Sequence, residues 1–444
     1  MRQRLSYVLA ACVVAVGTAL VAQQPADAPP AGGPPGAPAG GAPKGAFKGK
    51  GGPGRGAPQY RMEKGLPIET RAPNKADDHD VVPGQSRAPY EQTTAPVVTV
   101  LTDKLQNPWS MAFLPDGKIL ITEKPGRMRT LAKDGTLSEP LSGVPAVYVA
   151  GQVGLLDVAL DKNFARNRRI FFSYAETVGD TDSHIVVASA TLNPDATAIT
   201  GSKVIFGSMP ALNKQRFGAN QGGRIAIDRD GNLFVTIGDR APTPPHDYAQ
   251  KLDNTIGKMI HITPDGKPAP NNPFLKTAGV APEIWSYGHR SEEGLTINPE
   301  TGELWEIEHG PQGGDELNQP QAGKNYGWPV IVHGIDYNNT PINEGIVEKA
   351  GMEQPIYYWD PVIAPSGLAF YTGNQFPQWK NSLLVGALGG QMLDRLRMDG
   401  KKVVAEEPLL TGQGRTRIRD VRMGPDGMVY VLTDANSLMK LTPK

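Results

Sequence analysis

A two-part pattern of apolar and polar positions recurs along the chain from about residue 95. A short apolar run is followed by a turn rich in Pro, Asp, Asn and Gly, and then by a second run of alternating or β-branched residues. Such runs, bounded by turn residues, are typical of paired β-strands, and convincing helical periodicity is nearly absent. The pattern occurs over residues 111–123, 155–175, 223–239, 294–310, 367–388 and 421–434.

Six strand-turn-strand copies at intervals of a few tens of residues predict an all-β fold, a six-bladed β-propeller over residues 95–444. A β-sandwich is the alternative, but its hairpins are not expected to be so evenly spaced over so long a chain. A strand predicted at residues 96–101 precedes the first copy, and we expect it to join the last blade and close the ring. Loops at one mouth of the ring should then converge on the central channel.

The N-terminal region lacks this pattern. Residues 1–22 place Arg2 and Arg4 ahead of an apolar run, which predicts a signal peptide, with a transmembrane anchor as the alternative. Residues 23–94 are rich in Pro and Gly and predict a disordered tether that passes into an irregular lead-in. We therefore expect an exported protein, periplasmic or secreted, with no membrane span after signal cleavage. The only cysteine, Cys12, lies in the predicted signal, so no disulfide is expected.

The positive and negative charges of the chain balance, so any charged binding site must be local. The chain has 45 Lys+Arg and 45 Asp+Glu residues, so it offers no basic field for nucleic acid. The densest polar stretch is residues 283–329, where residues 308–316 combine a Gly-rich turn with adjacent carboxylates. Hard cations such as calcium bind carboxylate and carbonyl oxygens, although acidic turns also occur as solvated loops without metal.

Six motifs occur in register with the predicted blades: GQVGLLDVAL, GRIAIDRDGNLFVTIGD, EIWSYGHR, EHGPQGGDELN, GKNYGWP and RIRDVRMGPDG. Together they resemble the soluble pyrroloquinoline-quinone (PQQ)-dependent sugar dehydrogenases, the glucose/sorbosone and aldose sugar dehydrogenase group. The resemblance covers about Pro96 to Lys444. It implies that PQQ lies over the central channel with calcium at its reactive edge, and that an aldose is oxidised at its anomeric hydroxyl to a lactone. The partner is then a small-molecule sugar, and the electron acceptor stays unnamed.

The resemblance also assigns roles to matching positions. Hydride transfer to a quinone carbonyl needs a base for the hydroxyl proton, a cation at the carbonyl and donors for the developing oxyanion. The positions matching cofactor contacts are Gln152, Arg290, Tyr337, Arg417 and Arg419. Those matching calcium ligands or calcium-associated residues are Gly310, Pro311, Glu316 and Tyr326, with Asp315 as a supporting carboxylate. The catalytic positions are Asn220 and Asp239, where the acid orients the base.

The sequence departs from the pattern at the base itself, because Asn220 stands where the group has a histidine. An amide can hydrogen-bond a sugar hydroxyl but cannot take its proton, and losing a general base typically costs a factor of about 100 to 10,000 in rate. Residues 291–293 read Ser-Glu-Glu where Asn-Pro-Gln is usual. Gly389 stands where a lysine is expected.

Two interpretations follow from these departures. In the first, the enzyme binds PQQ and calcium, and Asp239 or a nearby histidine such as His289 or His246 serves as the base. In the second, the propeller has lost dehydrogenase activity and binds carbohydrate or hydrolyses a lactone with calcium.

Overall fold

The computed structural model describes residues 58–213, 219–241, 247–412 and 415–444. The chain divides into two compact units, Met1–Arg55 and Gly56–Lys444, and all described residues belong to the second. The predicted signal peptide and most of the predicted tether lie outside the described residues. Within those residues, no helix is both long and apolar enough to cross a membrane.

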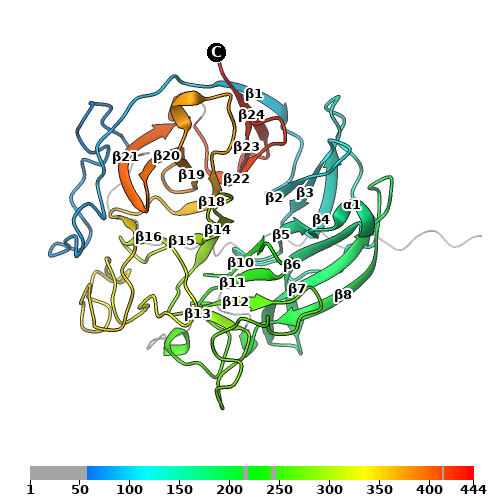
Figure 1. The fold of residues 1–444 in the computed structure, drawn as a ribbon, viewed down its shortest axis with the longest axis horizontal. Coiled ribbons are helices and arrows are strands. Elements are labelled where there is room, and N and C mark those ends of the chain that lie inside the picture. The colour runs from blue at the N-terminus through cyan, green and yellow to red at the C-terminus, as the bar shows by residue number, and fades with distance from the viewer. Residues whose placement is uncertain (1–57, 214–218, 242–246, 413–414) are drawn as a thin grey trace, which may run out of the picture. The chain divides into compact units, whose positions relative to one another are not determined.

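The second unit consists of six antiparallel sheets, which are the blades (Figure 1). Blade one contains β2 (Pro108–Phe113), β3 (Ile119–Glu123) and β4 (Arg127–Leu131). Blade two contains β5 (Leu155–Leu160), β6 (Arg169–Val178), β7 (Asp182–Leu192) and β8 (Ile199–Gly207), with β9 (Leu212–Asn213) paired to β7. Blade three contains β10 (Gly222–Ile227), β11 (Leu233–Ile237), β12 (Lys258–Ile262) and β13 (Ile284–Tyr287).

Blade four contains β14 (Glu292–Ile297), β15 (Leu304–Glu308), β16 (Asp315–Asn318) and β17 (Tyr357–Trp359). Blade five contains β18 (Pro365–Phe370), β19 (Ser382–Ala387), β20 (Met392–Asp399) and β21 (Lys402–Leu409). Blade six contains β22 (Ile418–Met423), β23 (Val429–Thr433), β24 (Leu438–Thr442) and β1 (Val97–Thr102). Helical turns in the described residues are short: α1 (Phe164–Asn167), η2 (Asp247–Gln250) and η3 (Pro377–Trp379).

The blades close into a ring around their innermost strands. β2, β5, β10, β14, β18 and β22 each contact the next in this order, and β22 contacts β2. Each repeated pattern in the sequence coincides with the first two strands of a blade, so the predicted six-bladed propeller is confirmed and the sandwich alternative is wrong. The strand predicted at residues 96–101 is β1, which pairs with β24 from Val97↔Thr442 onward. The last blade thus combines three C-terminal strands with a strand that precedes the first blade in the sequence.

Apolar side chains from facing blades form the core between them. One cluster joins Trp305 and Ile307 of blade four to Leu383 and Val385 of blade five, all 2% exposed or less. Complete burial of such a side chain contributes roughly 1.5–3 kcal/mol to folding. Alternating residues supply these contacts because successive side chains of a strand point to opposite faces of its sheet.

Every innermost strand begins with a shift of register against its neighbour. The shifts lie between Pro108/Ser110, Leu155/Val158, Gly222/Ile225, Glu292/Gly294, Pro365/Leu368 and Ile418/Asp420. A β-bulge bends the strand and changes the direction of nearby side chains. The six bulges therefore lie at one mouth of the ring, where the strand ends supply polar groups.

The predicted lead-in packs against the propeller as an extended segment with isolated bridges, such as Pro67↔Pro89. The Tyr60 hydroxyl donates to the Gly390 carbonyl at 3.0 Å, and the Asn74 amide donates to Asp360 at 2.9 Å. These contacts bring the start of the described chain to the loop after β19 and the following residues to the loop after β17.

Candidate active site

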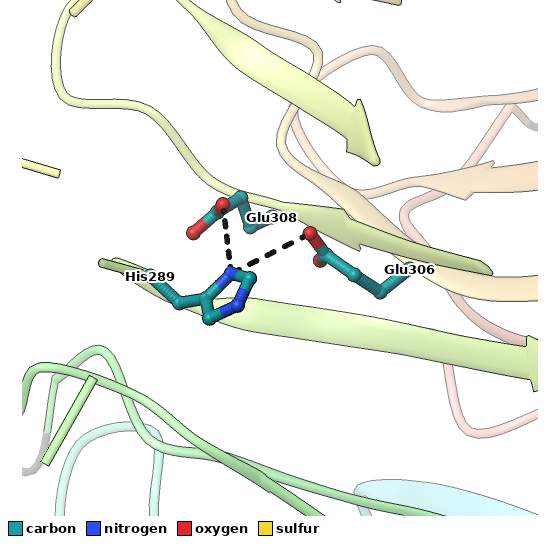
Figure 2. A group of neighbouring side chains, drawn as sticks. All are labelled: His289, Glu306 and Glu308. Atoms are coloured by element: carbon teal, nitrogen blue, oxygen red, sulfur yellow. Dashed lines mark hydrogen bonds and ion pairs between the residues drawn. The ribbon is translucent and has the colours of Figure 1, made fainter. Parts of the chain in front are cut away.

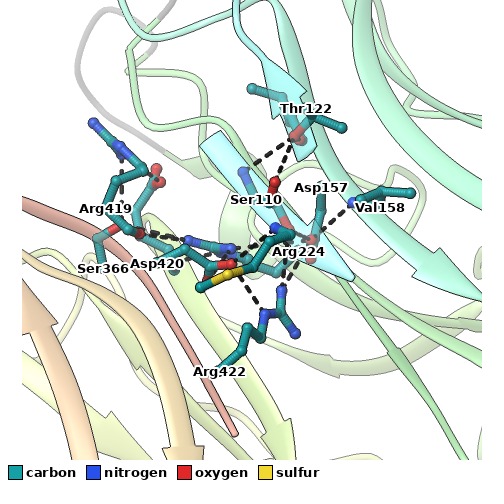
Figure 3. Close-up of polar contacts among 12 residues, drawn as sticks. Ser110, Thr122, Asp157, Val158, Arg224, Ser366, Arg419, Asp420 and Arg422 are labelled. Carbon is teal, nitrogen blue, oxygen red and sulfur yellow. Dashed lines mark hydrogen bonds and ion pairs between the residues drawn. The ribbon is translucent and has the colours of Figure 1, made fainter. Parts of the chain in front are cut away.

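A network of buried charges crosses the channel near the bulged strand ends (Figure 3). Arg224 on β10 donates to Asp420 on β22 at 2.8 Å, and its Nε donates to the Glu293 carbonyl at 2.7 Å. Arg422 donates to Asp157 on β5 and to Asp420, both at 3.0 Å. Arg224, Asp157 and Asp420 are each 1% exposed or less. The network therefore connects blade six to blades two and three, neither of which is its neighbour in the ring.

A cavity of ≈ 190 Å³ adjoins this network at the mouth with the bulges. Its lining includes Gln152, Gly222, Glu293, His309, Arg417 and Arg419. A larger hollow of ≈ 880 Å³ is lined by the turns that join β14 to β15, β18 to β19 and β20 to β21. Those turns lie at the opposite ends of the strands, so the smaller cavity is the candidate site despite its size.

Arg417 and Arg419 are held side by side by one carboxylate. Arg417 donates its Nε to Asp434 at 2.8 Å, and Arg419 donates its Nε to the other oxygen at 3.3 Å. Burial raises the pKa of Asp434, but the charge of Arg419 and the hydrogen bond from Arg417 outweigh it and hold the pKa below its ordinary range. Asp434 directly follows β23. This position was not predicted, because only the strand pairing brings it beside β22.

Asn220 and Asp239 form a hydrogen-bonded pair beside the cavity. The Asn220 Nδ2 donates to Asp239 Oδ1 at 2.8 Å, and the Trp328 indole donates to Asp239 Oδ2 at 2.8 Å. The Asn220 backbone amide donates to Gln152 Oε1 at 2.9 Å. Because Asp239 accepts from Nδ2, the amide oxygen of Asn220 is left as the hydrogen-bond acceptor of this side chain. Asn220 has φ = 49°, a conformation that Asn tolerates better than most residues.

Arg290 connects this pair to the Gly-rich turn. Its Nη1 donates to the carbonyls of His309 and Gly310, both at 2.8 Å, and its Nη2 donates to the Tyr337 hydroxyl at 3.3 Å. Its guanidinium lies 5.2 Å from the centre of the Trp328 ring. The Gly310 carbonyl that the resemblance assigns to calcium is therefore already an acceptor for Arg290.

Asp315 supports the turn that contains Gly310 and the buried Pro311. It accepts from the Gly310 amide at 2.8 Å and from the Ile363 and Ala364 amides at 2.7 Å. Burial raises the pKa of Asp315 to about 7, although these three N–H groups oppose the shift. The contacts fit the supporting role expected for this carboxylate.

Glu316 and Tyr326 lie apart from the cavity lining. Glu316 accepts from the Asn318 side chain at 3.0 Å, and the Tyr326 hydroxyl donates to the Gln319 carbonyl at 2.5 Å. The Tyr326 ring stacks on His289 at 4.8 Å between ring centres. Of the twelve expected site residues, Gln152, Arg417 and Arg419 line the cavity, whereas Glu316 and Tyr326 are not among its lining residues. The other seven are connected to one another through the contacts described above.

The departures at residues 291–293 and Gly389 adjoin the cavity. The Glu293 carboxylate lies 4.0 Å from Arg419 and accepts from Ser291 at 3.3 Å. Burial raises the pKa of Glu293 above its ordinary value, although the charge of Arg419 opposes the shift. A Cβ on Gly389 would lie 3.1 Å from the Ile363 carbonyl oxygen, so the expected lysine requires this loop to move slightly.

The candidate histidines differ in their access to the cavity. His309 lines it, but its Nε2 lies 2.8 Å from the Pro365 carbonyl and must therefore carry the proton. Burial lowers the pKa of His309 to about 3. His289 is 0% exposed and bonded to Ser286, whereas His246 lies outside the described residues. His289 is thus not placed to receive a proton from a ligand in the cavity.

A second polar cluster lies inside blade four (Figure 2). His289 Nδ1 lies 3.4 Å from Glu308 Oε1 and 3.8 Å from Glu306 Oε1. We call these three residues the buried triad. Sequence reasoning missed it, because its members become neighbours only through the pairing of β15 with its adjacent segments.

Comparisons with known proteins cover most of the chain. The model of the glucose/sorbosone dehydrogenase family matches residues 105–440. The chain is 45% identical over 351 residues to aldose sugar dehydrogenase YliI of Escherichia coli (strain K12), covering 78% of this chain and 93% of that protein. The crystal structure of soluble aldose sugar dehydrogenase from Escherichia coli in the apo-form matches with a TM-score of 0.75 at 44% identity, covering 79% and 100% of the two chains. The PQQ-bound aldose sugar dehydrogenase from Streptomyces coelicolor matches with a TM-score of 0.63 at 26% identity, covering 79% and 99%.

Proposed function

This chain belongs to the glucose/sorbosone dehydrogenase family, and we propose that it oxidises an aldose at the anomeric hydroxyl to the lactone, with PQQ and calcium. The observation that carries the proposal is the convergence of Arg290, Arg417 and Arg419 with Gln152 around one mouth of the ring. The PQQ-bound relative from Streptomyces coelicolor supports the choice of cofactor.

The donor set fits an anionic cofactor. Arg417 and Arg419 share Asp434 through their Nε atoms, so most of their Nη donors remain for a ligand in the cavity that they line. Arg290 Nε is buried and has no hydrogen-bond partner among the described residues. Guanidinium groups bind carboxylates through paired hydrogen bonds, and PQQ carries three carboxylates. A ligand of this kind satisfies donors that the protein leaves open.

The calcium assignment rests on the turn. The carbonyls of Gly310 and Pro311 would hold the cation. The Asp315 carboxylate holds this turn in place because it accepts a hydrogen bond from the Gly310 amide. Because Arg290 donates to the Gly310 carbonyl, its guanidinium must share or release this oxygen when the cation binds. When bound, PQQ would supply the hydride acceptor and calcium would withdraw electron density from its reactive carbonyl.

The chain's own residues would orient the sugar and its proton. The Asn220 amide oxygen can accept the anomeric O–H, and Asp239 holds the amide in that orientation. The amide has no basic pKa, so we assign the final acceptance of the proton to Asp239. As Asn220 Oδ1 takes the sugar proton, Nδ2 passes one of its own protons to Asp239 Oδ1, 2.8 Å away. Since Asp239 is 0% exposed and exchanges the proton only through the Asn220 amide in this proposal, we expect slow turnover.

Binding of PQQ tests the proposal. Purified protein with calcium should bind PQQ at micromolar concentration, and an aldose should change the absorbance of the bound cofactor. The matched variant Arg417→Gln should weaken binding at least tenfold without unfolding the protein, because Arg417 is half-exposed. Absence of PQQ binding by the wild type at micromolar concentration rules out the dehydrogenase proposal.

Asn220 gives a specific reason to test a second function. A propeller without a general base that still binds calcium could bind a carbohydrate or hydrolyse a lactone. Calcium-dependent lactone hydrolysis in the absence of PQQ, together with no PQQ binding, would favour this alternative. Lactone formation from an aldose in the presence of PQQ would exclude it.

We also propose that the protein is exported to the periplasm or the medium, because residues 1–22 have the pattern of a secretory signal. Fractionation of cells, with mass determination of the mature N-terminus, tests this. An intact Met1 on protein recovered only from the cytoplasm contradicts export.

A further inference from the structure

The buried triad belongs to a larger set of polar side chains on one face of blade four. Strand register places Glu292 opposite Glu308, Glu308 opposite Glu316, and Glu306 opposite Asn318. Side chains directly opposite each other, or two residues apart along a strand, share a face of the sheet. Four carboxylates and one amide therefore lie on the same face.

The imidazole of His289 is fixed with one nitrogen toward these carboxylates. Its Nε2 lies 2.8 Å from Ser286 Oγ, and its ring stacks on Tyr326. The opposite nitrogen, Nδ1, faces Glu306 and Glu308 (Figure 2), and the three ligand atoms lie within 4.8 Å of one another. His289 and Glu306 are 0% exposed and Glu308 is 3% exposed, so bulk water does not solvate their charges.

Several oxygens on this face accept no hydrogen bond from the residues that the structure describes. Both carboxylate oxygens of Glu306 and both of Glu292 lack a hydrogen bond, as does Oδ1 of Asn318. Glu292 is outside the triad, 0% exposed, and directly opposite Glu308, so its open oxygens are an observation independent of the triad itself. An ionised carboxylate without a partner costs several kcal/mol in a buried site.

Protonation alone does not remove this difficulty. A neutral carboxyl carries an O–H donor that also needs an acceptor. Asn318 Oδ1, on the residue directly opposite Glu306, is open to accept one such proton, but it cannot serve the open oxygens of both Glu306 and Glu292. A cation between the side chains satisfies the open oxygens together and offsets their charge. The arrangement therefore favours a bound cation over a set of shared protons.

We propose that His289, Glu306 and Glu308 bind a divalent cation of the zinc and manganese type, in a site separate from the calcium assigned to Gly310 and Pro311. Two ligands about 2.1 Å from a tetrahedral metal lie about 3.4 Å apart. The distances from Nδ1 to the two carboxylates, 3.4 and 3.8 Å, are close to this value. An imidazole nitrogen beside carboxylates suits zinc or manganese better than calcium, which prefers oxygen alone.

The remaining contacts complete the site. With a metal on Nδ1, the Nε2 proton of His289 points to Ser286, which fixes the ring as partners of metal-bound histidines usually do. Glu292 can supply a fourth ligand, since it lies directly opposite Glu308 on the same face of the blade. Asn318 supports the site instead, because its Nδ2 donates to Glu308 Oε1 at 3.2 Å.

The site has a consequence for the candidate active site. Glu308 Oε2 accepts the Arg290 backbone amide at 2.5 Å, and Glu308 ends the strand that leads directly into the Gly310–Pro311 turn. A metal on Glu308 therefore fixes the backbone that positions Arg290 and the turn. Its role is structural, and it is separate from the chemistry proposed for the cavity.

Metal loading of the full chain without PQQ tests the site. Protein stripped with a chelator and then dialysed against zinc alone should retain about one equivalent and melt at a higher temperature than the stripped protein. Cobalt as the probe should give a visible absorption band typical of nitrogen and oxygen ligands. Glu306→Gln should reduce retained zinc to below about a tenth of an equivalent.

Asp394→Asn is the matched control, because Asp394 is equally buried in the neighbouring blade and pairs with Glu406 without a histidine. It should retain zinc. If Glu306→Gln misfolds, His289→Gln and the wild-type titration still decide the question. Failure of the wild type to retain zinc, manganese or cobalt overturns the proposal, as does retention of calcium alone. Zinc retention that is unchanged in both Glu306→Gln and His289→Gln also overturns it. PQQ is absent throughout, so the result is independent of the dehydrogenase proposal.

Discussion

At the scale of single residues, Asn220 determines how fast the proposed reaction can proceed. The structure keeps the hydrogen bond to Asp239 that would orient a base at this position, but places an amide there. Asn220→His restores a group that can take the proton, so we expect kcat for aldose oxidation to rise by about 100- to 10,000-fold. Steady-state kinetics with PQQ and calcium measure this effect.

Asn220→Gln is the control for the histidine variant. It changes the length of the side chain without adding a base, and should not raise kcat. Equal rates in the histidine variant and the wild type would show that another group already serves as the base, or that Asp239 does not hold the introduced ring.

His309 predicts how stability depends on pH. Burial lowers its pKa to about 3 in the folded protein, whereas a histidine in the unfolded chain titrates near about 6.5. The unfolded state therefore binds the additional proton between these values, and the contribution of His309 is present above about pH 6.5 and lost progressively as the pH falls toward 3. Urea unfolding at several pH values should give a free energy of unfolding that falls more steeply for the wild type than for His309→Gln, by on the order of 1 kcal/mol per pH unit between these pKa values.

At the scale of the elements, the bulge in β18 depends on a backbone position that a side chain would block. Gly367 in β18 has φ = 74°, and a Cβ there would lie 2.7 Å from the Asp420 Cα and from the Val421 nitrogen on β22. Gly367→Ala should lower the free energy of unfolding by about 2–4 kcal/mol, because it combines left-handed strain with a backbone clash. Chemical denaturation measures the difference.

Gly400 offers the matched control, because it has φ = 58° and a Cβ at this position would have nothing within 4 Å. Gly400→Ala should cost only the conformational term, about 1 kcal/mol. Equal losses in the two variants would mean that β18 and β22 move apart without penalty, and that the close approach at the bulge does not stabilise the ring.

Local patterns explain how much of the fold the sequence predicts. Turn residues and alternation identify the first two strands of every blade, because both signals lie within about 20 residues of one another. The resemblance places Arg290 and Arg417 at strand ends, and the structure brings both to one mouth of the ring. Asp434 and Glu306 could not be predicted, because their partners become neighbours only through cross-strand register. Separating Glu316 and Tyr326 from the cavity needs the same information.

At the scale of the whole molecule, the charge network across the channel should contribute more to the free energy of unfolding than the number of its hydrogen bonds suggests. Arg224 of blade three is 1% exposed and donates to Asp420 of blade six at 2.8 Å, so the pair spans the ring. Arg224→Met leaves Asp420 with a buried charge whose remaining ion-pair partner among the described residues is Arg422. Breaking a buried pair in this way typically costs about 3–5 kcal/mol.

Arg397 provides the control. It pairs with Glu91, but the two side chains are 41% and 38% exposed, so Arg397→Met should lower the free energy of unfolding by less than about 1 kcal/mol. Denaturant unfolding followed by both circular dichroism and tryptophan fluorescence distinguishes the two variants. If the ring unfolds as one unit because charges couple opposite blades, Arg224→Met should lower the midpoint and separate the two transitions, whereas Arg397→Met should do neither. A small and equal loss in both variants would mean that contacts between adjacent blades alone hold the propeller closed.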